Sequence, residues 1–130
     1  MPAGEVLSPT ELRRLEHAVD VAEKLSGLTF SVFLGVTEED ARGYAERLHS
    51  ALPSAEDSVL VLCDPAFRVL EIVTGGQVRR VLDDFDCRLA AASMQTSFQA
   101  GDIVGGLVNG IQQLGQSARH PKTLHTVRQG

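Results

Sequence analysis

Apolar residues recur at steps of three and four near the start of the chain, a spacing that predicts an amphipathic helix. Ser8 can cap this helix, Pro9 suits its first position, and Glu11 completes a capping box with Ser8. Gly27 can take the left-handed conformation that commonly ends a helix. The first predicted element is therefore a helix between Ser8 and Gly27, with one apolar stripe directed at a core.

The next apolar segments have the spacing of strands. Residues 29–36 alternate between apolar and polar, which predicts a strand with one buried face. Residues 58–63 are apolar without alternation, as is typical of a central strand covered on both faces. A turn at residues 64–67 leads into another strand at 68–73, and so short a link requires the two strands to form an antiparallel hairpin.

Further helices follow from the same reasoning. Thr37 and the acidic residues after it favour a helix start, and Pro53 should end that helix, with His49 at its surface or boundary. Another helix is expected from about Asp84 to Phe98, and the last one after Gly101–Asp102. The residues expected to face inward on the helix from Asp84 are Leu89, Ala90, Met94 and Phe98.

The order helix, strand, helix, strand, strand, helix, helix defines the expected fold. The first two strands are joined through a helix, so they should be parallel with a right-handed crossover. Helices on both faces of a small mixed sheet then give an α/β fold, a three-layer α/β/α sandwich. We expect one domain at residues 8–116, between an N-terminal tail (1–7) and a flexible, basic C-terminal tail (117–130). Gly106 and Gly110 lie four residues apart and should allow another element to pack closely.

Length and charge narrow the classes of function. The chain has 130 residues, enough for one domain with a core, and 17 acidic against 12 basic residues give a net charge of −5. Because three of the bases lie in the last fourteen positions, the other 116 residues carry nine bases against seventeen acids, a net −8. We therefore expect no binding of nucleic acid through a basic face. Apolar runs stay short of the roughly 20 residues of a membrane span, and we expect a cytoplasmic protein, provided that no leader precedes this sequence.

The two cysteines, Cys63 and Cys87, lie 24 positions apart and do not form a CxxC pair. In a cytoplasmic protein we expect both to be reduced thiols that pack as small apolar side chains. A zinc site is not indicated, since no histidine lies at ligand spacing from them. No serine or cysteine has neighbours that imply activation by a base, so no catalytic residue is assigned.

Aspartates form the densest polar feature of the sequence. Asp83 and Asp84 stand at the start of a predicted helix, and Asp64 follows the predicted central strand. Hard cations such as Ca²⁺ bind several carboxylate and carbonyl oxygens, so one hypothesis brings these three side chains together as a divalent-cation site. The other hypothesis is helix capping, because acids at a helix N-terminus stabilise it without any ligand.

A second polar feature follows the hairpin. Gly75 and Gly76 could present backbone amides, and Arg79 and Arg80 guanidinium groups, to a phosphate. The established phosphate-loop patterns are absent from this segment. A turn with surface arginines is therefore the alternative interpretation of the same four residues.

Four segments together resemble the TPM domain family: residues 58–64, 68–75, 81–84 and 98–102. Within that family the chain looks closest to short actinobacterial proteins of unknown function. The resemblance implies an α/β/α sandwich. It also implies a divalent cation, notably Ca²⁺, near an aspartate that maps to Asp84 or Asp83, with a second acidic position at Asp64. Acid phosphatase activity is claimed for thylakoid-lumen members that act in photosystem repair.

Three functional hypotheses remain open at this stage. The leading one is a non-catalytic, soluble TPM-like module whose acidic edge, at Asp64, Asp83 and Asp84, binds a divalent cation or a protein partner. The alternative is a metal-assisted phosphatase in which Arg79, Arg80 or the glycine amides hold a phosphate ester. The third is a structural interaction domain without a ligand. The sequence leaves the oligomeric state open.

Overall fold

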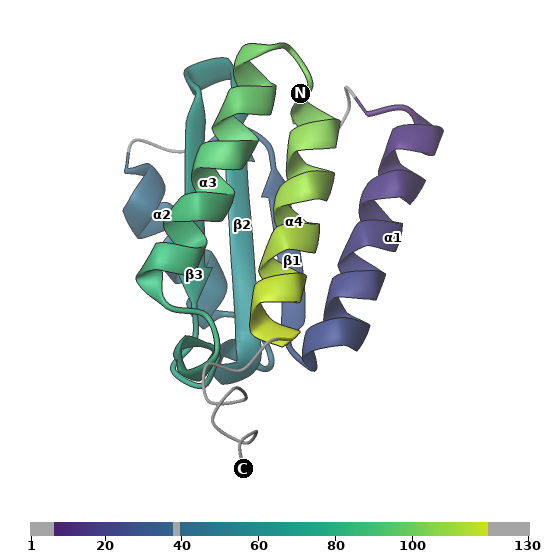
Figure 1. The fold of residues 1–130 in the computed structure, drawn as a ribbon. Helices are drawn as coiled ribbons and strands as arrows, with labels where there is room; N and C mark the ends of the chain where they lie inside the picture. The colour runs from purple at the N-terminus through teal and green to yellow at the C-terminus, as the bar shows by residue number, and fades with distance from the viewer. Residues whose placement is uncertain (1–6, 38–39, 120–130) are drawn as a thin grey trace.

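The structure is a computed structural model, and it describes residues 7–37 and 40–119. The predicted order of helices and strands is confirmed (Figure 1). The helices and strands are α1 (Pro9–Ser26), β1 (Thr29–Leu34), α2 (Ala41–Ser50), β2 (Ser58–Asp64), β3 (Val69–Thr74), α3 (Asp84–Gln99) and α4 (Ile103–Arg119). Short 3₁₀ turns lie between them, namely η2 (Ala55–Asp57), η3 (Pro65–Phe67) and η4 (Val78–Arg80).

The sheet has the order β1-β2-β3, with β2 in the centre. β1 runs parallel to β2, with Phe30 opposite Val59, and β2 runs antiparallel to β3, with Asp64 opposite Val69. Every residue of β2 is buried, as the unbroken apolar run predicts. The mixed sheet is therefore a parallel pair extended by a hairpin.

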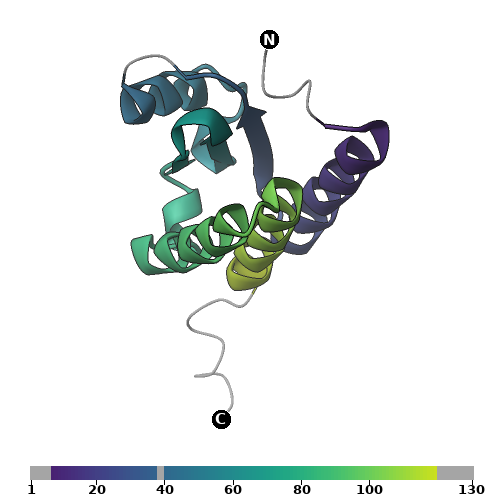
Figure 2. The same ribbon diagram turned by 90° about the horizontal axis from the view of Figure 1, so that it is seen from above.

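Helices cover both faces of this sheet. α1, α4 and α3 stand side by side on one face, and α2 lies alone on the other (Figures 1 and 2). The larger apolar cluster fills the space under the three helices, and a smaller cluster around Ala45 and Leu62 lies under α2. The predicted three-layer α/β arrangement is thus confirmed.

α4 is the most buried helix because it is held between α1 and α3. A Cβ atom added at Gly110 would lie 2.2 Å from the Met94 side chain, and one at Gly106 would lie 2.7 Å from the Phe98 ring. On the opposite side, a Cβ at Gly115 would lie 2.9 Å from Ala22 of α1. The glycines therefore permit the close packing that their spacing predicts.

The capping predictions are confirmed for α1 and corrected for α2. Ser8 and Glu11 form the predicted capping box, and Gly27 ends α1 with φ of 78°. α2 does not start after Thr37, because Asp40 is its N-cap and accepts a hydrogen bond from Gly43 N–H at 3.2 Å. Thr37 instead contacts the end of β2, as described below.

Two further expectations about side chains are wrong. Leu89 was expected to face inward, yet 46% of its surface is exposed, because Ala90 and Met94 direct the buried face of α3 toward α4. His49 is buried rather than at the surface, and its Nε2 lies 3.0 Å from the carbonyl oxygen of Ser58. This hydrogen bond links α2 to the start of β2.

The ends of the predicted domain are covered only in part. α4 continues to Arg119, so the segment expected to be a tail from residue 117 begins as helix. The rest of that predicted tail, residues 120–130, and most of the N-terminal one, residues 1–6, lie outside the described residues.

Candidate functional site

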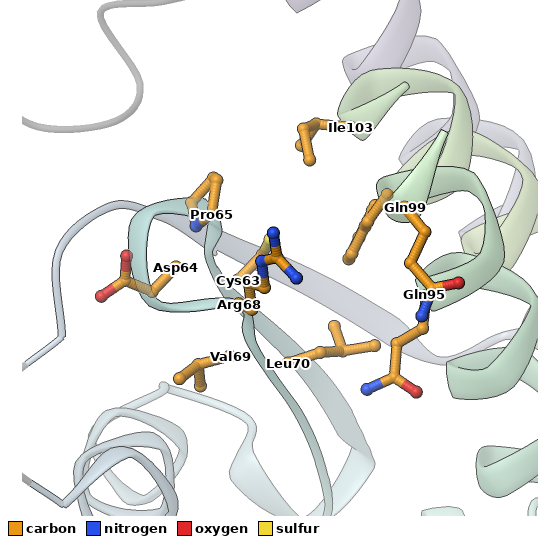
Figure 3. A pocket seen from close by; sticks show the side chains of 10 residues that line it. Cys63, Asp64, Pro65, Arg68, Val69, Leu70, Gln95, Gln99 and Ile103 are labelled. Atoms are coloured by element: carbon orange, nitrogen blue, oxygen red, sulfur yellow. The ribbon is translucent and has the colours of Figure 1, made fainter. Parts of the chain in front are cut away.

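A cavity of about 370 Å³ opens at the end of the sheet where β2 turns into β3 (Figure 3). One wall comes from this hairpin, and the other comes from the last turns of α3 and the first residue of α4. The residues that line it are Cys63, Asp64, Pro65, Arg68, Val69, Leu70, Gln95, Phe98, Gln99 and Ile103. Its volume lies near the lower end of the range of roughly 300–1,000 Å³ that is typical of small-molecule sites.

Arg68 owes its place to the Asp-Pro turn that precedes it. Pro65 begins the 3₁₀ turn η3, and Arg68 ends it in the left-handed conformation, with φ of 56° and ψ of 41°. Among the described residues Arg68 is the only non-glycine residue with a positive φ. This conformation costs a side chain with a Cβ about 1 kcal/mol or more.

The guanidinium group of Arg68 lies on the hairpin side of the cavity, and Gln95 and Gln99 lie on the α3 side (Figure 3). The side chain is exposed, and no hydrogen bond or ion pair joins it to any residue in the described part of the chain. A full positive charge therefore stands at the cavity with its donors available to a ligand.

Asp64 is completely buried, but its carboxylate points away from the cavity (Figure 3). Its Oδ2 accepts hydrogen bonds from the backbone N–H of Thr37 at 2.8 Å and from the Thr37 hydroxyl at 3.0 Å. Its Oδ1 accepts a hydrogen bond from Ala66 N–H at 3.2 Å. The carboxylate thus fastens the segment after β1 to the turn that carries Arg68.

The α3 side of the cavity combines apolar and amide groups. Phe98 and Ile103 are half-buried, whereas Gln95 and Gln99 are exposed and lie one helical turn apart. Within the described chain the two glutamine amides make no hydrogen bond. With Leu70 on the hairpin side, the lining of the cavity combines apolar side chains with polar groups.

Cys63 is the nucleophile-type side chain of the cavity, and it is unreactive at neutral pH. Burial raises the pKa of the Cys63 thiol to about 12, and the negative charge of Asp64 adds to the shift. The thiol therefore stays protonated and packs as an apolar group, as the sequence predicts. Both cysteines are free thiols in this structure.

The structure does not bring Asp64 together with Asp83 and Asp84. β3 carries the chain from Asp64, opposite Val69, to Thr74, opposite Val59, a distance of roughly 17 Å at about 3.3 Å per residue. α3 then starts at that far end and returns to the cavity over its 16 residues, roughly 24 Å. The antiparallel hairpin therefore separates Asp64 from the other two aspartates, and metal binding by Asp64, Asp83 and Asp84 stays a prediction.

Asp83 has a local role in the backbone at the start of α3. Asp83 is the N-cap of α3, where its Oδ1 accepts a hydrogen bond from Asp86 N–H at 2.9 Å. Asp86 Oδ2 accepts in return from Asp83 N–H at 3.1 Å, which completes a capping box. The capping hypothesis is thus confirmed. No group of three potential metal-ligating side chains occurs in the part of the chain that the structure describes.

The glycine-rich turn offers few free donors for a phosphate. The N–H of Gly75 donates to the Ser58 carbonyl at 3.0 Å, and a Cβ on Gly76 would lie 2.7 Å from the Glu56 carboxylate. Arg79 donates to the carbonyl of Thr74. This geometry favours the alternative interpretation as a turn, and phosphate binding by Gly75, Gly76, Arg79 and Arg80 stays a prediction.

Sequence reasoning missed Arg68, Gln95 and Gln99. The Asp64–Pro65 pair does predict the turn, but the conformation of Arg68 depends on the hairpin geometry that follows it. The two glutamines read as ordinary exposed helix positions. Only the packing of α3 against the sheet places them opposite Arg68.

Fold and cavity together define a small α/β domain with a pocket of ligand size beside a mixed sheet. A family model with the description Domain of unknown function (DUF5130) matches residues 3–115, and the chain belongs to this family. The expected membership of the TPM domain family is therefore wrong. The cation and phosphatase expectations that came with that resemblance lose this support.

Two relatives from Mycobacterium tuberculosis match most of this chain. Uncharacterized proteins from two strains of Mycobacterium tuberculosis, one of them Rv2468c of strain H37Rv, are 26% identical to this chain over 104 residues. The match covers 80% of this chain and 62% of each relative, so the chain spans less than two thirds of their length.

Two solved structures share the fold. The BA42 protein of the psychrophilic bacterium Bizionia argentinensis superposes with a TM-score of 0.78 at 19% identity, covering 96% of this chain and 91% of its own. The N-terminal domain of the cg2496 protein of Corynebacterium glutamicum has a TM-score of 0.74 at 16% identity, covering 88% of this chain and 75% of its own. At these identities the similarity defines the fold alone.

No helix in residues 7–37 and 40–119 is both long enough and apolar enough to cross a membrane.

Proposed function

We propose that this domain is a non-catalytic binding module that takes a small organic molecule into the cavity between the β2–β3 hairpin and the α3–α4 connection. The observation that carries the proposal is the cavity itself: about 370 Å³, lined by apolar side chains together with a guanidinium group and two amides. A concave site that combines apolar side chains with a few polar groups is typical of small-molecule binding.

The state of the two buried titratable residues supports binding rather than catalysis. The Cys63 thiol has a pKa of about 12 and is not a nucleophile at neutral pH. Asp64 is held by three hydrogen bonds on the side away from the cavity. A general base or nucleophile must reach the substrate, so neither group suits that role.

Other functions of this acidic domain stay predictions. Binding of a divalent cation such as Ca²⁺, binding of a protein partner and metal-assisted phosphatase activity have no geometric feature that favours them over the cavity. Among these, the cation hypothesis can be separated from helix capping by a substitution at Asp83.

A fragment screen observed by NMR tests the proposal. The full chain is labelled with ¹⁵N and titrated with a library of small neutral, anionic and cationic compounds. We expect saturable shifts of the backbone amide signals of the cavity residues, above all Leu70 and Phe98. A screen in which no compound shifts these signals, or in which all hits map to other surfaces, would contradict the proposed function.

A further inference from the structure

We infer that the ligand of this cavity is a small monocarboxylate with a short apolar tail, whose carboxylate binds the guanidinium group of Arg68. This inference rests on the proposed function and assigns a chemical class to its ligand.

The charge at the cavity selects an anion of low charge. Arg68 is the single cationic side chain among the cavity-lining residues, and it has no acidic partner in the described part of the chain. The nearest carboxylate along the chain, Asp64, points away from the cavity and is already satisfied by Thr37 and Ala66. The single positive charge of Arg68 therefore suits a ligand with a single negative charge.

The donors around the cavity suit a planar acceptor. A guanidinium group presents two parallel N–H donors that match the two oxygens of a carboxylate. The amides of Gln95 and Gln99, on the facing wall, can donate to an oxygen without adding charge. A phosphate dianion usually binds several backbone N–H groups or more than one cation, and the lining of this cavity does not combine those groups.

The apolar wall defines the rest of the ligand. Leu70 on the hairpin and Phe98 and Ile103 at the α3–α4 connection line the same cavity. They can cover an aromatic ring or a branched aliphatic group, whereas a polar tail would lose hydrogen bonds to water there. A volume of about 370 Å³ limits the ligand to a small molecule.

The backbone of Arg68 adds an independent reason. Its φ of 56° is a conformation that glycine adopts freely and that an arginine adopts at a cost in stability. Backbone strain of this kind is typical of ligand-binding positions, where a residue is retained for its function although its conformation lowers the stability of the fold. The strain indicates a functional role for Arg68, and the cavity beside it indicates that this role is to bind a ligand.

The test uses a pair of probes with the same shape and different charge. The ¹⁵N-labelled full chain is titrated with 3-phenylpropionate and, separately, with 3-phenylpropanamide, at pH 7 and constant ionic strength. We expect the carboxylate to shift the amide signals of the cavity residues with a millimolar Kd. The amide should bind at least about tenfold more weakly, because a charge-assisted hydrogen bond is lost.

Two variants locate the effect at Arg68. Arg68→Gly removes the guanidinium group and relieves the backbone, so the variant remains folded while its affinity for 3-phenylpropionate falls at least about tenfold. Arg14→Gln on α1 makes the same change of net charge at an exposed site far along the sequence, and it should bind as the parent chain does.

The outcomes separate this inference from the proposed function. If both probes shift the cavity signals with equal affinity, or if Arg68→Gly binds the carboxylate unchanged, the carboxylate assignment is overturned while the cavity stays a binding site. Competition by inorganic phosphate as effective as that by 3-phenylpropionate would also overturn it. If neither probe shifts the cavity signals, this inference fails, and hits from the wider screen then decide the proposed function.

Discussion

The hydroxyl and backbone N–H groups of Thr37 both donate to the same oxygen of Asp64, at 3.0 and 2.8 Å. These hydrogen bonds connect positions 27 residues apart in sequence, and the carboxylate that receives them is fully buried. A buried carboxylate is costly unless its oxygens are satisfied, so the loop after β1 and the turn before β3 stabilise each other. That turn ends at Arg68, so the pair also supports the cavity.

Thr37→Val should lower the free energy of unfolding by about 1–2 kcal/mol, because it removes one donor to a buried charge and preserves the shape of the side chain. Thr37→Ser is the matched control: it retains the hydroxyl and should cost less than the valine variant. Urea denaturation followed by circular dichroism measures both. Equal stability of the valine variant and the parent chain would show that the hydroxyl contributes nothing to the pair.

Gly110→Ala tests the close contact of α4 with α3. In an exposed helix, alanine is more favourable than glycine by about 1 kcal/mol. Here a Cβ would lie 2.2 Å from the end of the Met94 side chain, so the flexible side chain must move within a packed core. We expect a net destabilisation of about 1–3 kcal/mol, seen as a lower Tm.

The neighbouring position supplies the control for this variant. Asn109 is exposed on the same turn of α4, so Asn109→Ala should leave stability unchanged or raise it by a few tenths of a kcal/mol. If Gly110→Ala stabilises the protein as much as Asn109→Ala does, the packing of Met94 against α4 is looser than described.

The buried Cys63 thiol and the half-buried Cys87 thiol should make the protein less stable at alkaline pH. Burial raises the pKa of Cys63 from 9.0 to about 12 and that of Cys87 to about 11. Below pH 9 both states of the chain hold these protons, and stability is unaffected. Above pH 9 the unfolded thiols lose protons that the folded ones retain, so the free energy of unfolding falls as the pH rises toward the folded pKa values.

For Cys63 alone the decline reaches at most about 1.4 kcal/mol per pH unit. Denaturation at several pH values from 8 to 10.5 measures it, and Cys63→Ala should show a shallower decline than the parent chain, whatever its stability at pH 8. Parallel declines for the two proteins would contradict the assignment to this thiol.

Local features of the fold were predictable, and long-range ones were not. The capping box of Ser8, the left-handed Gly27 and the buried strand 58–63 follow from short patterns, because each depends on neighbours within a few residues. The role of Thr37 could not be read in the same way, since its partner Asp64 is brought to it only by the parallel pairing of β1 and β2. A threonine followed by acidic residues has the same sequence pattern whether it caps a helix or donates hydrogen bonds to a distant carboxylate.

The candidate site failed to emerge from sequence for a related reason. The sequence suggested Asp64 and Asp84 as ligands of one cation because both carry a carboxylate. The hairpin, however, directs them to opposite ends of the sheet. Arg68 and Gln99 looked ordinary, and the return of α3 along the sheet places them at one cavity. The arrangement of strands and helices decides which polar residues lie close together. Local sequence patterns therefore do not predict these contacts.

Asp83→Ala distinguishes capping from a cation site at the start of α3. Loss of the capping box should lower stability by about 1 kcal/mol, equally with and without millimolar Ca²⁺. Thermal melts of the parent chain and the variant, each with Ca²⁺ or with a chelator, measure this. A Ca²⁺-dependent rise in Tm of the parent chain that the variant lacks would instead support the predicted cation site.

Arg68→Gly should raise the free energy of unfolding, although it deletes a whole side chain. The left-handed backbone of Arg68 is strained for a residue with a Cβ and relaxed for glycine, which favours the variant by about 1 kcal/mol. The greater freedom of glycine in the unfolded chain offsets part of this gain. Arg80→Gly, at the end of the 3₁₀ turn η4, is the matched control. It brings the same gain of freedom in the unfolded chain, but it relieves no positive φ. This variant should therefore be destabilised by roughly 0.5–1 kcal/mol. Urea denaturation of both variants checks the opposite signs. If Arg68→Gly proves as destabilising as Arg80→Gly, the residue is not strained, and the stability argument that marks Arg68 as a ligand-binding side chain is lost.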